Sequence, residues 1–436
     1  MKKASVSIGI IGFGTVGTGV VRILLEKHKE LERRLGFPLI LKKVADIDTK
    51  RKRGIILPQN ILVKDERAVL NDSAVDIVVE LIGGIHPAKE YILKALKNGK
   101  HVVTANKALL ASEGSEIFKT ARENKVEIGF EAAVAGGIPI IKIVRESLIG
   151  NKIQAIYGII NGTSNYILTR MTEEGIDFST ALKEAQTQGF AEADPALDVG
   201  GVDSAHKLAI LASLSFGIPF SLGEIYTEGI TRITPLDISY ALEFGYNIKL
   251  LAIAKQINRE IELRVHPTMI PKDYLISSVK GVFNAVYIEG DAIGSALYYG
   301  RGAGEMPTGS AVVSDIVDIA RNVNTGAVNR IRGIGMPEKL NLRIKKMEDV
   351  HSCYYFRFTV IDKPGVLSKI SGILGAYNIS IKSVIQKGRE KEKAVPLVMM
   401  THKAREKDVI YALKEIDRLA VVPRKTMYIR VEKGEE

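Results

Sequence analysis

Short hydrophobic runs alternate with segments in which hydrophobic residues recur every three or four positions over residues 1–130. The runs have the length of buried strands, and the recurring spacing is that of amphipathic helices. Alternation of this kind predicts a parallel sheet covered by helices on both faces. The predicted strands are Val6–Gly12, Leu39–Ala45, Asp76–Leu81, His101–Thr104 and Val126–Phe130, and the helices between them include Pro87–Asn98 and Lys107–Asn124.

A glycine loop joins the first predicted strand to the first predicted helix. In a GxGxxG turn the first glycine allows the tight bend, the second lets a pyrophosphate approach the backbone, and the third lets helix and strand pack closely. Free N–H groups at the helix start then face the phosphates. Glycines also occur in ordinary strand-to-helix turns, but with strand and helix both in place the pattern favours dinucleotide binding. The loop residues are Gly12, Phe13, Gly14, Thr15, Val16 and Gly17.

Asp46 ends the second predicted strand, where a carboxylate can bind the ribose of NAD. The basic run Lys50–Arg53 follows at once and would suit the extra phosphate of NADP, unless it is simply a solvated loop. These signals conflict, so the choice between NAD and NADP stays open. Ligands of such sheets bind beyond the carboxyl ends of the strands, which here also include Ile82–His86 and Thr104–Lys107.

Length and composition set wider bounds. A chain of 436 residues predicts two to four domains, and 46% hydrophobic with 25% charged residues is ordinary for a globular protein. No hydrophobic run has the length of a membrane span, and the N-terminus lacks a signal-peptide pattern. The single cysteine, Cys353, excludes an internal disulfide and fits a reducing cytosol, so we expect a cytoplasmic protein without a membrane partner.

The net charge of +11 is concentrated at the two ends of the chain. Residues 1–53 carry a net charge of +8 and residues 351–436 a net charge of +7, which leaves −4 for the middle. Because the positive charge forms no stripe interleaved with aromatic residues, nucleic-acid binding is disfavoured.

The densest chemistry lies between Gly189 and Lys207, a run with four carboxylates and one lysine. Asp203 and Lys207 are four positions apart, so they share one face of a predicted helix over 204–215. On an exposed helix this pair would contribute little. The helix is otherwise apolar and should be buried, and a buried lysine beside a carboxylate suits proton transfer. His206 points about 100° away and is expected to be structural.

Three further segments carry glycines or polar residues at predicted turns. Residues 131–139 end a strand and enter a helix, and residues 157–166 run from a strand through an Asn-Gly-Thr-Ser turn into another helix. A second glycine-rich loop, residues 300–310, precedes a long helix and indicates a return of the chain to the cofactor, although it would also suit a plain interdomain loop.

These motifs together resemble those of homoserine dehydrogenases, and the resemblance runs the full length of the chain. That family interconverts aspartate semialdehyde and homoserine with NAD(P). The resemblance rests on the glycine loop, Thr104-Ala-Asn-Lys107, Asn161-Gly-Thr-Ser-Asn-Tyr166, the Gly189–Lys207 run and the Arg301–Ser310 loop.

The resemblance implies a role for each matched residue. Lys207 would be the proton donor, Asp203 would assist it and bind substrate, and Lys107 would lie near the nicotinamide. Further candidates for substrate binding are Glu192, Asp198 and Tyr157, and further candidates for cofactor binding are Asp46, Thr104, Gly189 and Gly304. The family's monovalent-cation site, for Na⁺ or K⁺, would match Glu131, Val134, Gly136 and Ile138.

Two features bear on this interpretation. Many family members carry an arginine for NADP near the position of Asp46, and its absence here puts NADP preference in doubt. The phosphorylating route from the same aldehyde needs a catalytic cysteine, and Cys353 lies outside the catalytic middle of the chain, so that route is excluded.

Residues 351–436 predict the order βαββαβ of a ferredoxin-like unit. The predicted elements are Tyr354–Val360, Pro364–Tyr377, Ile379–Gln386, Val395–Thr401, Arg405–Ile416 and Ala420–Val431, with a loop at Lys387–Lys393. The Asp362–Leu367 segment resembles the ACT regulatory domain, which implies an amino-acid effector near Asp362, Gly365 and Val366. A dimerising module without a ligand is the alternative.

The predicted fold is therefore α/β with three domains. These are a Rossmann-type dinucleotide-binding domain at 1–130, to which a helix within 305–345 returns, an α+β substrate and dimerisation domain at 131–304, and the ACT domain at 351–436. We expect a homodimer or homotetramer. A non-catalytic amino-acid or nucleotide sensor with the same fold is the alternative function, but it would have no reason to keep Lys107, Glu192, Asp203 and Lys207 together.

Overall fold

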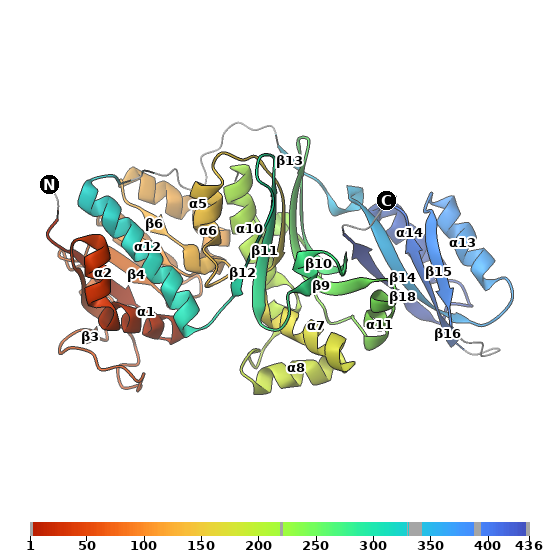
Figure 1. The fold of residues 1–436 in the computed structure, drawn as a ribbon, viewed down its shortest axis with the longest axis horizontal. Coiled ribbons are helices and arrows are strands. Elements are labelled where there is room, and N and C mark those ends of the chain that lie inside the picture. The colour runs from red at the N-terminus through yellow and green to blue at the C-terminus, as the bar shows by residue number, and fades with distance from the viewer. Residues whose placement is uncertain (1–2, 219–220, 329, 331–341, 388–393, 433–436) are drawn as a thin grey trace. The chain divides into compact units, whose positions relative to one another are not determined.

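A computed structural model describes residues 3–218, 221–328, 330, 342–387 and 394–432 of the chain. The chain forms two compact units (Figure 1). The first unit comprises Met1–Gly162, Asp203–Ile225 and Val282–Asn341, and the second comprises Thr163–Val202, Tyr226–Gly281 and Leu342–Glu436.

The first unit is built on a parallel sheet with strand order β3-β2-β1-β4-β5-β6. Its strands are β1 (Val6–Ile11), β2 (Leu39–Ala45), β3 (Leu62–Val63), β4 (Ile77–Glu80), β5 (His101–Thr104) and β6 (Ile128–Gly129). The helices between and beside them are α1 (Thr15–Glu26), α2 (His28–Leu35), α3 (Arg67–Leu70), α4 (Ala88–Lys97), α5 (Lys107–Glu123) and α12 (Glu305–Thr325). The predicted doubly covered parallel sheet is confirmed.

Helix α12 comes from far along the chain and lies beside α1, as Figure 1 shows. Glycines make this approach possible, because a Cβ at Gly19 would lie 2.2 Å from the carbonyl oxygen of Glu305 and one at Gly309 would lie 2.9 Å from the carbonyl carbon of Gly19. The helix ends at Thr325, because Gly326 adopts a φ of +69°.

The rest of the first unit carries three neighbouring antiparallel strands in the order β12-β11-β7, and the helix with the candidate catalytic lysine. Its elements are η1 (Glu131–Ala133), α6 (Ile140–Lys142), η2 (Ile143–Ser147), β7 (Ile153–Ile159), α10 (Val202–Phe216), η3 (Leu222–Glu224), β11 (Phe283–Gly290) and β12 (Gly294–Arg301).

The second unit combines a middle part of the chain with the C-terminal domain. The middle part contains α7 (Gly162–Glu174), α8 (Phe178–Thr187), α9 (Ala196–Val199), β8 (Tyr226–Thr227), α11 (Pro235–Glu243), β9 (Tyr246–Ile257), β10 (Glu260–Pro271) and η4 (Leu275–Ser278). The C-terminal part contains β13 (Arg343–Ile344), η5 (Met347–Asp349), β14 (His351–Ile361), α13 (Val366–Ala376), β15 (Ile381–Gln386), β16 (Ala394–Thr401), β17 (Ala404–Arg405), α14 (Glu406–Ile416) and β18 (Arg424–Val431).

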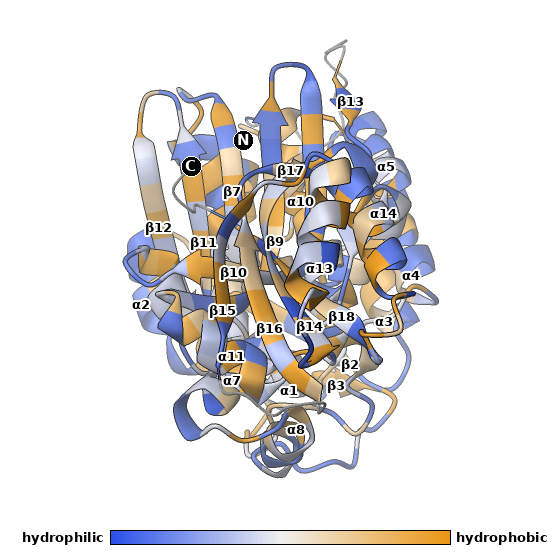
Figure 2. Ribbon diagram, turned by 90° about the vertical axis from the view of Figure 1, so that its right-hand side faces the viewer, coloured by the Kyte–Doolittle hydropathy of each residue, from blue (hydrophilic) through white to orange (hydrophobic). Residues whose placement is uncertain are grey.

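One sheet runs through both parts of this unit in the order β9-β10-β18-β14-β16-β15, because β18 pairs with β10 as well as with β14. Hydrophobic residues run along β16 (Figure 2) and pack with β14 under α13 and α14. The predicted βαββαβ order is confirmed, with the short β17 added. Strand β18 begins later than predicted, because residues before Pro423 form turns and Pro423 has no N–H to donate to the ladder. The predicted loop Lys387–Lys393 lies, beyond Lys387, outside the described residues. The three predicted domain limits remain a prediction.

Two glycine variants distinguish the glycine that allows helix packing from the glycine that leaves room for a phosphate. Gly19→Ala should lower the free energy of unfolding by about 1–3 kcal/mol, because the new methyl group meets the backbone of α12. Gly14→Ala should leave stability nearly unchanged, because no heavy atom lies within 4 Å of the Cβ position. It should instead weaken dinucleotide binding, which depends on that open space. Thermal unfolding by circular dichroism and titration with NADH or NADPH measure the two effects. Equal stability of the two variants would contradict the close α1–α12 contact.

Candidate active site

Two lysines flank one buried aspartate in the first unit. Asp203 lies in the first turn of α10 and Lys207 one turn later, with 2.7 Å between the Nζ of Lys207 and the Oδ2 of Asp203. Lys107, the first residue of α5, places its Nζ 2.6 Å from Oδ1 of the same carboxylate. Asp203 and Lys207 are buried, whereas 39% of the Lys107 side chain is exposed. The pair is therefore not the exposed ion pair that helical spacing alone allows.

The end of β7 completes the polar shell of this group. The Nζ of Lys207 donates to the carbonyl oxygen of Ile160 at 2.7 Å, and the amide of Asn161 donates to Asp203 at 2.9 Å. The sequence predicted a turn at Asn161 but not its contact with Asp203, because the end of a strand and a position on a distant helix share no local pattern.

Electrostatics keep this carboxylate ionised. Burial alone would raise the pKa of Asp203, but the ammonium groups of Lys207 and Lys107 lower that pKa well below its ordinary value. Burial lowers the pKa of the half-buried His206, so this neighbour is neutral near pH 7. The centre thus contains one anion held between two lysines.

The segment Thr104–Lys107 is held by the neighbouring strand. Thr104 donates to the buried carboxylate of Glu80 at 2.7 Å, and Glu80 also accepts the N–H of Ile82 at 2.8 Å. Asn106 caps α5 by accepting the N–H of Leu109 at 3.1 Å. Glu80 therefore organises two of the predicted ligand-facing loops. Sequence reasoning missed it, because a carboxylate inside a strand gives no signal of its partners.

At the glycine loop, Asp46 is already engaged by the protein. Its Oδ2 accepts the N–H of Phe13 at 2.6 Å and its Oδ1 accepts the N–H of Asp48 at 2.8 Å. Arg53 places its Nη2 3.1 Å from Oδ1, and its Cζ lies 4.6 Å from the centre of the Phe13 ring. Only 5% of the Arg53 side chain is exposed, so this member of the basic run is no solvated loop residue.

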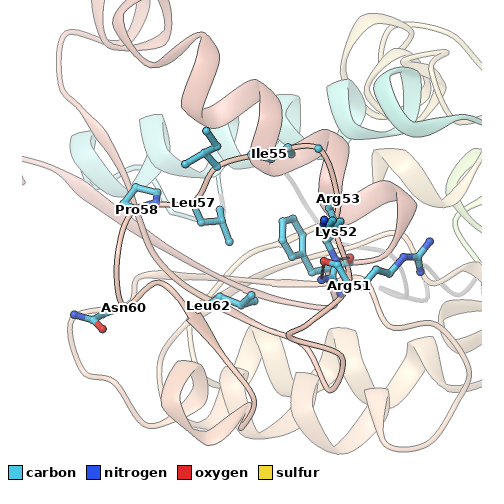
Figure 3. Close-up of a pocket in the computed structure, with 11 residues that line it drawn as sticks. Arg51, Lys52, Arg53, Ile55, Leu57, Pro58, Asn60 and Leu62 are labelled. Atoms are coloured by element: carbon cyan, nitrogen blue, oxygen red, sulfur yellow. Dashed lines mark hydrogen bonds between the residues drawn. The ribbon is translucent and has the colours of Figure 1, made fainter.

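A cavity of about 510 Å³ lies beside Phe13 and Arg53. Figure 3 shows Arg51, Lys52 and Arg53 at one end of it and Leu57 and Pro58 toward the other. The cavity thus offers a cationic wall and an apolar wall directly beside the candidate ribose carboxylate.

The predicted cation ligands lie in one loop of the first unit. Both carboxylate oxygens of Glu131 accept helix N–H groups, from Ile141 at 2.7 Å and Lys142 at 2.9 Å. Burial raises the pKa of Glu131 to about 7. The backbone of Ile138 accepts the N–H of Ile140 at 2.7 Å, and no cluster of three or more His, Cys, Asp or Glu suited to a metal occurs among the described residues. Val134 and Gly136 belong to the same loop, where Gly136 has a φ of +50°.

The remaining predicted site residues are distributed over both units. Tyr157 is buried on β7 with its ring edge against Tyr287, and Gly304, with a φ of +120°, precedes α12, both in the first unit. Gly189, Glu192 and Asp198 belong to the second unit. There the hydroxyl of Ser164 donates to the backbone carbonyl of Asp198 at 2.9 Å.

The predicted effector residues surround the start of α13 in the C-terminal domain. Gly365 precedes the helix with a φ of +84°, and Val366 is its first, buried residue. One carboxylate oxygen of Asp362 is buried without a hydrogen-bond partner.

Comparisons with known proteins agree over nearly the whole chain. The family model described as homoserine dehydrogenase matches residues 139–317, its NAD binding domain matches residues 12–131, and the ACT domain model matches residues 354–421. A homoserine dehydrogenase of Neisseria gonorrhoeae is 46% identical over 429 residues, 98% of each chain.

Solved structures give the same result. A homoserine dehydrogenase from Thiobacillus denitrificans matches with a TM-score of 0.92 and 45% identity over 98% of each chain. A hyperthermophilic archaeal homoserine dehydrogenase in complex with NADPH matches with a TM-score of 0.62 and 29% identity, over 72% of this chain and 97% of that one.

A dinucleotide-binding sheet in one unit with a buried lysine–aspartate pair is the arrangement of a nicotinamide-dependent oxidoreductase. The matches narrow this class, and the chain belongs to the homoserine dehydrogenase family. The predicted family and the predicted ACT domain are thereby confirmed. No helix in the described part of the chain is long and apolar enough to cross a membrane.

Asp203→Asn tests the electrostatics of the centre. Because the folded-state pKa of Asp203 is lowered, its ionised form stabilises the fold above the unfolded pKa, about 4, and this stabilisation is lost as the pH falls toward the folded pKa. The difference in free energy of unfolding between wild type and variant should therefore be constant above about pH 5 and shrink below about pH 4. Denaturant unfolding at several pH values measures it, with the exposed Asp273→Asn as control. A difference that grows toward acid pH would contradict the assignment.

Proposed function

We propose that the chain catalyses the reversible NAD(P)-dependent reduction of L-aspartate 4-semialdehyde to L-homoserine, a step toward threonine, methionine and isoleucine. The observation that carries the proposal is the buried Lys207, held against Asp203 on α10. The comparisons give no support to the alternative of a non-catalytic sensor.

The glycine loop fits a dinucleotide. The Cβ position of Gly14 is open, with no heavy atom within 4 Å, and the loop leads directly into the N-terminus of α1. Bound nicotinamide would supply or accept the hydride at the substrate carbon. The adenosine end would lie beside Asp46 and the cavity next to Phe13.

The protein's own contribution is proton transfer and charge stabilisation. Lys207 donates a proton to the carbonyl oxygen in reduction and receives it in oxidation, and its positive charge stabilises the developing alkoxide. Asp203 orients Lys207 through their hydrogen bond, while Asn161 orients Asp203. Lys107 shares the same carboxylate and adds positive charge near the reacting oxygen.

Substrate recognition would use acidic and aromatic groups. The substrate carries an ammonium group, which matches the carboxylates of Glu192 and Asp198, and Asp203 offers a further carboxylate. Tyr157 completes the proposed set. These assignments rest on the sequence motifs of the family.

The proposed cofactor preference rests on the pairing of Asp46 with Arg53. A bare carboxylate at Asp46 would repel a 2′-phosphate and so favour NAD over NADP. Arg53 offsets that charge, so the repulsion is weaker than the sequence indicated. We propose that the enzyme accepts both cofactors; the relative solved with NADPH supports the second.

A structural Na⁺ or K⁺ is proposed at the loop formed by Glu131, Val134, Gly136 and Ile138, whose oxygen ligands suit a hard cation. The protein is proposed to be a cytoplasmic homodimer or homotetramer.

The C-terminal domain is proposed to bind an inhibitory amino acid, threonine first among the candidates. The N-terminus of α13 suits a carboxylate, and the unpaired oxygen of Asp362 suits an ammonium group. A chain truncated before residue 350 would be a poor test of this site. It would lack Glu432 and so leave the fully buried guanidinium of Arg264 without one of its carboxylate partners. Threonine binding to the full chain is the sharper measurement.

Lys207→Ala tests the proposed reaction. Turnover should fall about 10²–10⁴-fold while cofactor affinity changes little, because the lysine acts on the reacting oxygen. Absorbance of the reduced nicotinamide with homoserine, NAD and NADP measures it. Lys100→Met is the matched control, because Lys100 is also a buried lysine of the first unit but donates to the carbonyls of Asp72 and Val75. A Lys207→Ala enzyme retaining about a third of wild-type turnover would refute the role.

Arg53→Gln tests the cofactor assignment. With the guanidinium removed, the Asp46 carboxylate repels the 2′-phosphate, so the ratio of kcat/KM for NADP to that for NAD should fall at least about tenfold. Lys52→Gln, which removes an exposed cation of the same run, should change the ratio less. An unchanged ratio in Arg53→Gln would mean that Asp46 does not face the 2′ position.

A further inference from the structure

Charged side chains gather where the last strand of the C-terminal domain joins β10 in the second unit. They form two clusters. The Arg264 cluster consists of Lys255, Glu262, Arg264, Lys345 and Glu432, and the Arg430 cluster consists of Tyr226, Glu228, Glu406 and Arg430. Neither cluster has a part in the reaction described above.

Arg430 is fully buried on β18 and bonds to both parts of the second unit. Its Nε donates to Glu406 of the C-terminal domain at 2.9 Å. Its Nη1 donates to Glu228 at 2.9 Å and its Nη2 to the hydroxyl of Tyr226 at 3.1 Å, both in the middle part of the chain. The Tyr226 hydroxyl in turn lies 3.1 Å from Glu228, so one guanidinium ties three groups together.

The backbone after Tyr226 lies directly against the segment that precedes α10. A Cβ at Gly229 would lie 2.2 Å from the carbonyl oxygen of Val199, and the N–H of Ile230 donates to that oxygen at 2.9 Å. Gly201 has a φ of +84°, and a Cβ there would lie 3.3 Å from the carbonyl oxygen of Glu228. The close approach requires glycine at 229, and the left-handed backbone favours glycine at 201.

The segment held in this way belongs to the proposed substrate-binding run. It contains α9, with Asp198 at its third position, and it leads at Val202 into the helix that bears Asp203 and Lys207. A shift of the backbone at residues 228–230 would therefore displace α9 and Asp198 within the second unit.

We propose that Arg430 and Glu228 are positioning residues through which the C-terminal domain sets the geometry of the substrate-binding segment 196–201. The inference rests on the proposed function and adds to it a route by which an effector bound to the C-terminal domain changes substrate affinity. Binding that moves α14 and Glu406 relative to β18 shifts Arg430, and Arg430 transmits the shift through Glu228.

Glu228→Gln tests the route, and Lys255→Gln is its matched control. Each side chain is about one-fifth exposed, each pairs with a residue of the C-terminal segment, and each variant replaces a charge by a neutral amide. Lys255 lies in the Arg264 cluster and bonds to Glu432 rather than to the backbone path toward segment 196–201.

The readouts are the KM for homoserine, the KM for the cofactor, kcat and the thermal midpoint of the full-length enzyme. Glu228→Gln should raise the KM for homoserine at least about fivefold with the cofactor KM within about twofold of wild type. Lys255→Gln should leave both constants within about twofold, even where its thermal midpoint falls equally. A merely structural role would move both variants alike.

Tyr226→Phe protects the test against a Glu228→Gln chain that fails to fold. It removes only the hydroxyl between Arg430 and Glu228, and it should raise the KM for homoserine about two- to threefold. Unchanged homoserine KM in both variants, or a parallel rise of homoserine and cofactor KM, overturns the inference. Wild-type turnover of homoserine, measured first, decides the proposed function separately.

Discussion

The burial of one carboxylate between two ammonium groups is the constraint on which the first unit depends. A charge removed from water must be matched by charges and hydrogen bonds, and Asp203 obtains them from Lys107, Lys207 and Asn161. These partners come from α5, α10 and the end of β7, so the carboxylate fixes three elements at one point. Removing one member of a buried pair costs about 3–5 kcal/mol, because it leaves the other charge buried without a partner. The geometry that the proposed proton transfer needs is therefore the geometry that the buried charges already require.

The same logic explains how the dinucleotide half is prepared. Phe13 is held by the Asp46 carboxylate on its N–H and by Arg53 on its carbonyl, so the glycine loop is organised by the protein itself. The close contact of Gly19 with α12 places a helix from late in the chain beside the cofactor helix. Preorganisation of this kind means that binding energy is not spent on ordering the loop. The basic run Lys50–Arg53, for which a solvated loop was one interpretation, therefore contains one residue, Arg53, that holds the glycine loop in place.

Most of the fold could be predicted because hydrophobic periodicity and glycine positions are local signals. Strands β1, β2 and β5 and helices α4, α5 and α10 lie within two residues of their predicted limits. The pairing of Asp203 with Lys207 was also local, since it follows from helical spacing. Lys107 beside Asp203, Glu80 beneath Thr104 and Arg53 on Asp46 are contacts between distant parts of the chain, and no periodicity encodes them. The start of β18 was placed too early because Val421 and Val422 have strand-like side chains, whereas Pro423 and the turn before it decide the ladder.

The C-terminal domain is joined to the middle of the chain by a shared sheet and by balanced buried charge rather than by a flexible connection. Four cations and four carboxylates line the junction of β10 and β18 in the second unit of the chain. Apolar side chains of similar volume would often stabilise such a junction as well or better, so the charges are weak evidence for stability alone. The charges add geometric specificity to the junction, because an arginine that bonds through several N–H groups restricts how its carboxylates can be arranged. In the proposed route, a change in the position of the domain requires that one of these carboxylates change its partner. The route proposed above therefore runs through Glu406, Arg430 and Glu228, which join the C-terminal domain to the middle part of the second unit.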